Sequence, residues 1–167
     1  MGDPTASRPH MPDYGVDTPE WEALPWSWAR ARLDAARNLW LVTVSGRGRP
    51  HSLPVWGVWA DDEHRFGFSC APGSRKARNL ADNPRCVVTT ESTVECLSLE
   101  GEANRVTNDE RLAFWIARYL AKYRALAPDL SEEFLRSNLI FEVTPERAFA
   151  IIEREDEFAN RATRWTF

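Results

Sequence analysis

The sequence contains few cysteines, and their placement excludes two common kinds of site. There are three cysteines in 167 residues, Cys70, Cys86 and Cys96, and none belongs to a Cys-x-x-Cys pair. Each lies in an apolar run typical of a strand, so we expect free thiols rather than a zinc site or a disulfide framework. The three histidines are far apart in the sequence. We therefore assign no metal site and no Ser/His/Asp or Cys/His pair.

Long apolar runs and an excess of positive charge are also missing. No stretch approaches the roughly 20 apolar residues of a membrane-spanning helix, and the polar, proline-rich start does not resemble a secretion signal. A net charge of −4 argues against nucleic-acid or anionic-membrane partners. We expect a cytoplasmic protein. Of the 21 basic residues only Lys76 and Lys122 are lysines, an excess of arginine that we attribute to codon bias.

The chain divides into a short leader and one domain. Residues 1–17 are rich in proline, glycine, serine and aspartate and predict a flexible leader. Residues 18–167 are long enough for a single domain. Thr18-Pro19-Glu20 is typical of a helix start, and helix is predicted to resume after Pro25 and to continue to about Arg37.

Apolar runs separated by short turns predict a mainly antiparallel β-fold. The expected strands are residues 39–44, 49–60, 65–70, 86–90, 94–106, 139–143 and 147–153. The expected helices are residues 74–81, 108–125 and 131–136. Many hairpin-spaced strands with few helices between them favour an antiparallel barrel of six or seven strands with peripheral helices.

The helix at 108–125 carries one apolar stripe at helical spacing. Its members are Leu112, Trp115, Ile116, Tyr119, Leu120 and Tyr123. Such a stripe indicates a core-facing side, so we interpret its aromatic residues as packing rather than as a ligand cage.

The helix start at Ser74 has an unusual charge. Ser74 can cap this helix, and Arg75 and Lys76 occupy its first turn, where the helix dipole favours acidic residues. Cations there are explained if an anion binds at the free N–H groups, which would place a phosphate beside Ser69 and Ser74. The alternative is a solvated basic helix face, and this pattern leaves both interpretations open.

The second predicted strand contains a proline. Pro54 cannot donate to a ladder, so this strand is expected at a sheet edge or at a bulge. Unpaired backbone groups beside it could meet a planar heterocycle, with Trp56 packed alongside. The alternative is an ordinary solvent-facing edge.

In this order, these segments resemble the FMN-binding split-barrel superfamily, of which pyridoxamine 5′-phosphate oxidase is the best-known member. The similarity spans about residues 30–167 and is carried by residues 48–56, 66–70, 73–80, 83–85, 100–103 and 163–167. It is greatest to the flavin/deazaflavin branch that uses coenzyme F420. The longer substrate-binding set and basic C-terminal signature of true pyridoxamine 5′-phosphate oxidases are not found here, so that substrate is not implied.

The resemblance implies a cofactor site, with F420 or FMN as the cofactor. The phosphate would be bound by Ser69, Ser74, Arg75 and Lys76, with Asn79 supporting the loop. The ring would be lined by His51, Leu53, Pro54, Val55 and Trp56, and Cys70 would lie in the same site. Trp165 would reach the ring from the partner subunit, on a C-terminal tail that docks at the dimer interface.

The resemblance further implies a homodimeric oxidoreductase. It would transfer hydride to or from a small unsaturated or quinone-like substrate, and no catalytic side chain is assigned. The alternative is a non-catalytic carrier of flavin, haem or another tetrapyrrole on the same fold. Trp21, Trp26 and Trp28 either pack within the N-terminal segment or form a lid over the ring.

Overall fold

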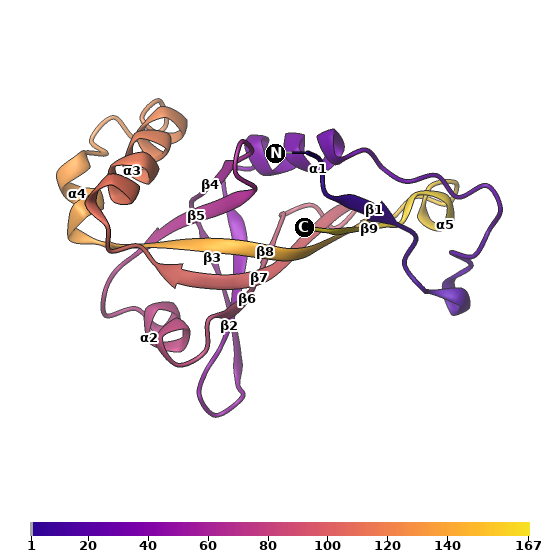
Figure 1. Cartoon of the computed structure of the whole chain (residues 1–167), viewed down its shortest axis with the longest axis horizontal. Helices are drawn as coiled ribbons and strands as arrows, with labels where there is room; N and C mark the ends of the chain where they lie inside the picture. Colours follow the sequence, from indigo (N-terminus) through magenta and orange to yellow (C-terminus); the bar gives the residue numbers. More distant parts are fainter. Residues whose placement is uncertain (1) are drawn as a thin grey trace.

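The computed structural model describes residues 2–167 and consists mainly of one antiparallel sheet (Figure 1). The strands are β1 Thr5–Ser7, β2 Leu39–Val44, β3 Pro50–Val55, β4 Gly57–Ala60, β5 Arg65–Cys70, β6 Arg85–Thr89, β7 Glu95–Arg105, β8 Leu139–Ile152 and β9 Thr163–Thr166. The helices are the 3-10 helix η1 Pro12–Tyr14 and the α-helices α1 Trp26–Ala35, α2 Arg75–Asp82, α3 Asp109–Tyr123, α4 Glu132–Ser137 and α5 Phe158–Arg161. No helix among residues 2–167 has the length and apolar character needed to cross a membrane.

The sheet curls into a barrel that stays open along one line. Its strand order is β1-β9-β8-β7-β6-β2-β3, and β8 also pairs with β5, which pairs with β4. The two free ends of the curled part, β3 and β4, follow one another in the sequence and are separated by Trp56 alone. Val55 lies opposite Leu39 of β2, whereas Gly57 lies opposite Phe68 of β5. The predicted split barrel is therefore confirmed, and its opening falls between β3 and β5.

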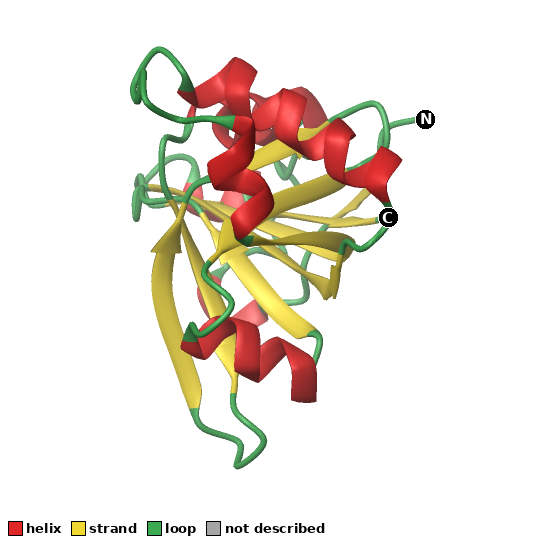
Figure 2. Ribbon diagram, turned by 90° about the vertical axis from the view of Figure 1, so that its left-hand side faces the viewer, coloured by secondary structure: helices red, strands yellow, loops and turns green. Residues whose placement is uncertain are grey.

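Alternating side chains build the core of this barrel. In β7, Leu97, Leu99, Gly101 and Ala103 are buried, and the residues that alternate with them are partly exposed. This is the pattern of a strand with one face in the core and one face toward solvent. The helices lie on the outside of the curved sheet (Figure 2).

Two strand boundaries differ from the prediction. The strand expected over residues 49–60 is divided into β3 and β4, because pairing switches from β2 to β5 at Trp56. The two strands expected over 139–143 and 147–153 form the single strand β8. Pro145 interrupts the register only locally: β8 bulges at Glu146, so that the consecutive β7 residues Glu100 and Gly101 lie opposite Arg147 and Pro145. A Cβ on Gly101 would lie 2.2 Å from the Thr144 carbonyl oxygen, so only glycine allows this approach.

The N-terminal region also differs from the prediction. The leader over residues 1–17 contains β1, which pairs with β9, and a buried Val16. A high content of proline and glycine predicts flexibility. It carries no information about an open sheet edge elsewhere in the chain, with which a short strand can pair. No helix begins at residues 18–20, and α1 begins at Trp26, directly after Pro25.

The N-terminal tryptophan that starts α1 belongs to the core. Trp26 is 2% exposed and packs edge-on against Trp59 and Trp165. Its role within this chain is therefore packing, and it does not form a lid.

Candidate functional site

A cavity of about 390 Å³ lies at the opening of the barrel. Three segments line it: the end of β3, the end of β5 with the start of α2, and the region from α3 to α4. The lining residues are Pro54, Val55, Trp56, Ser69, Cys70, Ala71, Ser74, Lys76, Tyr119, Leu130, Phe134, Leu135 and Asn138. We call this cavity the split pocket.

One end of the split pocket is polar and faces the start of α2. Ser74 has extended dihedral angles, and its Oγ accepts the Ala77 N–H at 3.2 Å, as an N-cap does. The amides of Arg75 and Lys76 follow in the first turn, where helix N–H groups have no acceptor within the helix. The first turn of α2 contains no acidic residue. This end is therefore arranged to bind an anion.

The other end of the split pocket is apolar and is built by α4 and the loop before it. Leu130 and Leu135 are buried, whereas Phe134 is 56% exposed. Val55 adds an apolar contact from the opposite wall. The pocket thus has an anion-binding end and a hydrocarbon-lined end, as a site for an amphipathic ligand requires.

Two tyrosines of α3 bind the backbone near Trp56, and only Tyr119 bridges the two walls of the pocket. The Tyr119 hydroxyl accepts the Ser69 N–H at 2.7 Å and donates to the Trp56 carbonyl oxygen. The Tyr123 hydroxyl accepts the Gly57 N–H at 2.8 Å, and the Trp56 ring stacks on the Tyr123 ring with centroids 4.6 Å apart. The predicted core-facing stripe therefore packs, as expected, but its hydroxyl groups also bind the backbone next to the pocket.

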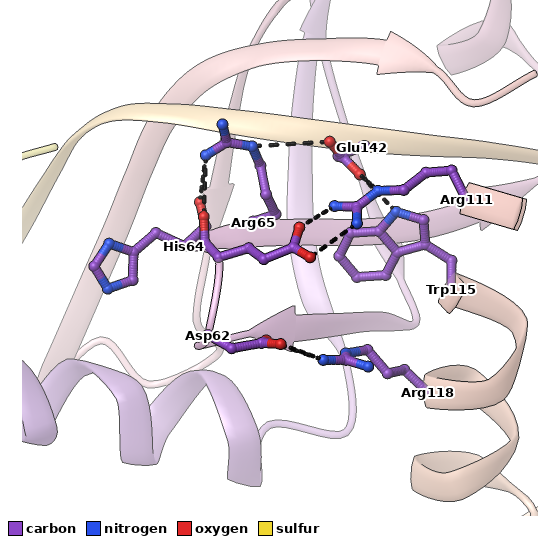
Figure 3. A network of polar contacts seen from close by, with 8 residues as sticks. Asp62, His64, Arg65, Arg111, Trp115, Arg118 and Glu142 are labelled. Atoms are coloured by element: carbon purple, nitrogen blue, oxygen red, sulfur yellow. Dashed lines mark hydrogen bonds and ion pairs between the residues drawn. The ribbon is translucent and has the colours of Figure 1, made fainter. Parts of the chain in front are cut away.

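Charged side chains fix α3 against the sheet (Figure 3). Arg111 forms ion pairs with Glu63 in the β4–β5 turn and with Glu142 of β8. Trp115 donates its indole N–H to Glu142 at 2.7 Å, and Arg118 binds Asp62 at 2.9 Å. At the other end of α3, Lys122 donates to two backbone carbonyl groups, and burial lowers the pKa of its ammonium. These contacts set the position of Tyr119 relative to the pocket.

The structure brings together a majority of the cofactor-binding residues expected from the sequence. Those that line the split pocket are Pro54, Val55, Trp56, Ser69, Cys70, Ser74 and Lys76. The segments 54–56 and 69–76 thus lie together in one pocket, because β3 and β5 end on the two sides of the barrel opening.

Five expected residues lie outside the pocket lining. Arg75 is exposed on the first turn of α2, and Asn79 is buried with its side-chain N–H donated to Thr43 Oγ1 at 2.9 Å, which fastens α2 to β2. His51 and Leu53 lie on β3; Leu53 is 49% exposed, and His51 Nε2 is buried without a hydrogen-bond partner among the described residues.

Trp165 requires a correction. It is fully buried in the core of its own chain, 5.5 Å from Trp26 between ring centroids. Because β9 pairs with β8 and places Trp165 opposite Ala148, alternation along the strand turns the indole inward. The side chain does not extend toward a second subunit.

Sequence reasoning missed the third wall of the pocket. Tyr119, Leu130, Phe134, Leu135 and Asn138 come from α3 and α4, about 40 to 70 residues after the anion-binding segment. One signal was present in the sequence: a tyrosine in a core-facing stripe must find a partner for its hydroxyl, which leucine would not need.

Two side chains of the pocket, Cys70 and Tyr119, are held in the neutral state. Burial raises the pKa of the Cys70 thiol, although its contacts with Ser74 and Lys76 act in the opposite direction. Burial also raises the pKa of Tyr119. These two groups are therefore not arranged to act as a thiolate or a phenolate nucleophile.

Comparison with solved structures places this architecture among known split barrels. HutZ, a haem storage protein from Vibrio cholerae, is similar over 73% of this chain and 91% of its own, with 21% identity and a TM-score of 0.61. A conserved hypothetical protein from Mycobacterium tuberculosis matches over 86% and 85%, with 17% identity and a TM-score of 0.64. A protein described as an F420 reductase matches over 71% and 94%, with 20% identity and a TM-score of 0.58.

The fold thus defines the class, an open antiparallel split barrel with a pocket at its opening. The family model described as pyridoxamine 5′-phosphate oxidase matches residues 28–152, and the chain belongs to this family. No curated protein matches the sequence.

Proposed function

We propose that the split pocket binds a phosphate-bearing flat cofactor, F420 or FMN, and that the protein is an oxidoreductase that uses it. The observation that carries this proposal is the convergence of Ser69, Ser74 and Lys76 at the N-terminus of α2, opposite an apolar wall. The family membership and the likeness to an F420 reductase support it.

The donor set of the pocket fits such a cofactor. Hydroxyl groups, a lysine and first-turn amides are the groups that bind phosphate in proteins. Along the wall from Pro54 to Trp56, the chain passes from one ladder to the next, so the Trp56 amide belongs to neither strand. This stretch offers a flat apolar edge beside a backbone N–H group outside the ladders. A ring that carries nitrogen and oxygen atoms requires both.

The chain's own residues would bind and orient, while the cofactor would supply the hydride chemistry. Lys76 and Ser74 would hold the phosphate, and the backbone near Trp56 would stabilise charge on the ring. The Tyr119 hydroxyl is committed to two backbone groups and so does not serve as an acid. A small unsaturated or quinone-like acceptor would therefore take its proton from water.

The proposal is tested by titration of the purified protein with FMN and with F420, followed by fluorescence. We expect F420 to bind more tightly, given the resemblance to the F420 branch. Replacement Lys76→Glu should weaken binding about 100-fold, because a charge-assisted hydrogen bond is replaced by repulsion. The control Arg124→Glu makes the same change in net charge at an exposed position outside the pocket and should bind as the wild type does. Unchanged affinity in Lys76→Glu would refute the phosphate site.

A second candidate is a carrier that holds its ligand without turnover. It is favoured by the lack of an available acid among the described pocket residues, and HutZ is described as a haem storage protein. Oxidation of reduced F420 in the presence of quinones or enones separates the two. Turnover with any acceptor supports the oxidoreductase, and tight binding without turnover supports the carrier.

We also propose that two copies of the chain form a homodimer through the outer face of β2 and β3. Trp40 is 42% exposed there and lies opposite Pro54, which itself lines the split pocket. An exposed tryptophan next to a binding pocket is typical of an interface.

A further inference from the structure

The pocket exists because a ladder stops one residue early. Between β4 and β5, Val58 lies opposite Gly67 and Gly57 lies opposite Phe68. Continuing this register by one residue would place Trp56 opposite Ser69. No direct bond between Trp56 and Ser69 is present in the described chain, and Trp56 belongs to no strand.

The missing pair is one that should exchange hydrogen bonds. In an antiparallel ladder, hydrogen-bonded and non-hydrogen-bonded pairs alternate. The Gly57 N–H is directed to Tyr123 and not to β5, so Gly57 and Phe68 are a non-hydrogen-bonded pair. Trp56 and Ser69 would be the hydrogen-bonded pair, with the Ser69 N–H donated to the Trp56 carbonyl oxygen.

The Tyr119 hydroxyl occupies the place of that bond. It accepts the Ser69 N–H at 2.7 Å and donates to the Trp56 carbonyl oxygen, so the donor and the acceptor of that one ladder bond are both satisfied through it. A direct bond spans about 2.9 Å, and two bonds in series separate the strands by roughly 2 Å more. Beyond this point the next pair in register, Val55 and Cys70, line the walls of the split pocket.

We propose that Tyr119 is a positioning residue that keeps the split pocket open, its hydroxyl inserted between β3 and β5 where the ladder would otherwise continue. The position of the hydroxyl is fixed from outside the barrel by the ion pairs of Arg111 and Arg118 along α3 (Figure 3). Only the cofactor-binding part of the test below rests on the proposed function.

The test compares Tyr119→Phe with Tyr123→Phe, a matched change one turn along the same helix. Tyr123 also bonds backbone, but it does not line the pocket. Without the Tyr119 hydroxyl, Trp56 and Ser69 can pair directly and the opening narrows. We expect Tyr119→Phe to weaken FMN or F420 binding about tenfold or more while remaining folded by thermal unfolding, and Tyr123→Phe to retain wild-type affinity.

A second readout needs no cofactor. Cys70 lies beyond the inserted hydroxyl, and its reaction with a thiol reagent reports access to the pocket. The experiment uses a background with Cys86→Ala and Cys96→Ser, in which Cys70 is the one thiol left, because Cys86 also lines a cavity, on the outer face of the sheet. Labelling of Cys70 should slow about tenfold in Tyr119→Phe. Equal or faster labelling, or an equal effect of Tyr123→Phe, would overturn the inference. If the wild type binds neither cofactor, the proposed function fails, and the labelling result still decides the role of Tyr119.

Discussion

At the residue scale, Phe134 combines a fixed backbone with an exposed ring. Its N–H is accepted by Ser131 Oγ at 3.1 Å, and its carbonyl oxygen accepts from Ser137 Oγ at 2.7 Å and from Asn138 Nδ2 at 2.9 Å. These bonds hold a helix of only six residues in shape. An aromatic ring that is 56% exposed and held at the edge of a pocket is placed to cover a ligand.

We therefore expect Phe134→Ala to weaken cofactor binding about tenfold, through loss of apolar area that the ligand would bury. The control is Leu126→Ala, which removes a side chain of similar exposure (53%) from the loop between α3 and α4 but outside the pocket. Fluorescence titration measures both. Inorganic phosphate, used as a competitor, should bind the wild type and Phe134→Ala equally, because it contacts only the polar end. Equal cofactor affinity in the two alanine variants would contradict this role.

At the element scale, α3 is held to the sheet by the ion pairs around Arg111. The hydrogen bond from Arg111 lowers the pKa of Glu63 below its usual value near 4.5. A carboxyl group with a lowered pKa in the folded state stabilises the protein above its unfolded pKa, and this contribution is lost as the pH falls through the folded pKa. The attachment of α3 to the sheet through the ion pair of Arg111 with Glu63 is thus expected to weaken in acid.

Glu63→Gln should lower the free energy of unfolding by about 1 kcal/mol at pH 7, because a partly exposed ion pair contributes little more than this to stability. The difference from the wild type should shrink as the pH falls below 4.5 and through the lowered pKa of Glu63 in the folded state, because the carboxylate is then protonated in both states. Urea unfolding at pH 7 and at successively lower pH values measures this. Glu133→Gln, at an exposed position without an ion pair in the described chain, should have no effect at any of these pH values. A deficit that persists in acid would show that the charge of Glu63 is not its cause.

The elements also show what the sequence could predict. β2 and β5 have the expected bounds because their runs of alternating or continuous apolar residues end at clear turns. The grouping of Ser69, Ser74 and Lys76 in one pocket was predicted because these residues are close in sequence to a helix start. The break at Trp56 was not, because it depends on a tyrosine more than 60 residues away. The pairing of β1 with β9 likewise depends on a partner at the far end of the chain.

At the scale of the whole molecule, the opening of the barrel and its outer face are adjacent. Along β2, Leu39, Leu41 and Thr43 point into the core. The alternating residues Trp40, Val42 and Val44 face outward. The outer face continues onto β6, β7 and β8, where Arg147 of β8 forms an ion pair with Glu100 of β7 at 3.3 Å. Because this face carries apolar residues and charges of both signs, it is the face that we propose a second copy of the chain would bind.

This arrangement predicts that dimerisation and cofactor binding are lost together. Trp40→Glu places a charge at the centre of the outer face, and we expect sedimentation to show a monomer that remains folded. Because Pro54 faces Trp40 across the ladder and also lines the split pocket, the same variant should bind the cofactor at least tenfold more weakly. Leu126→Glu introduces the same charge at an exposed site in the loop between α3 and α4, outside this face, and should remain dimeric with full affinity. A Trp40→Glu protein that stays dimeric would place the interface elsewhere, and a monomer with unchanged affinity would show that one chain completes the site.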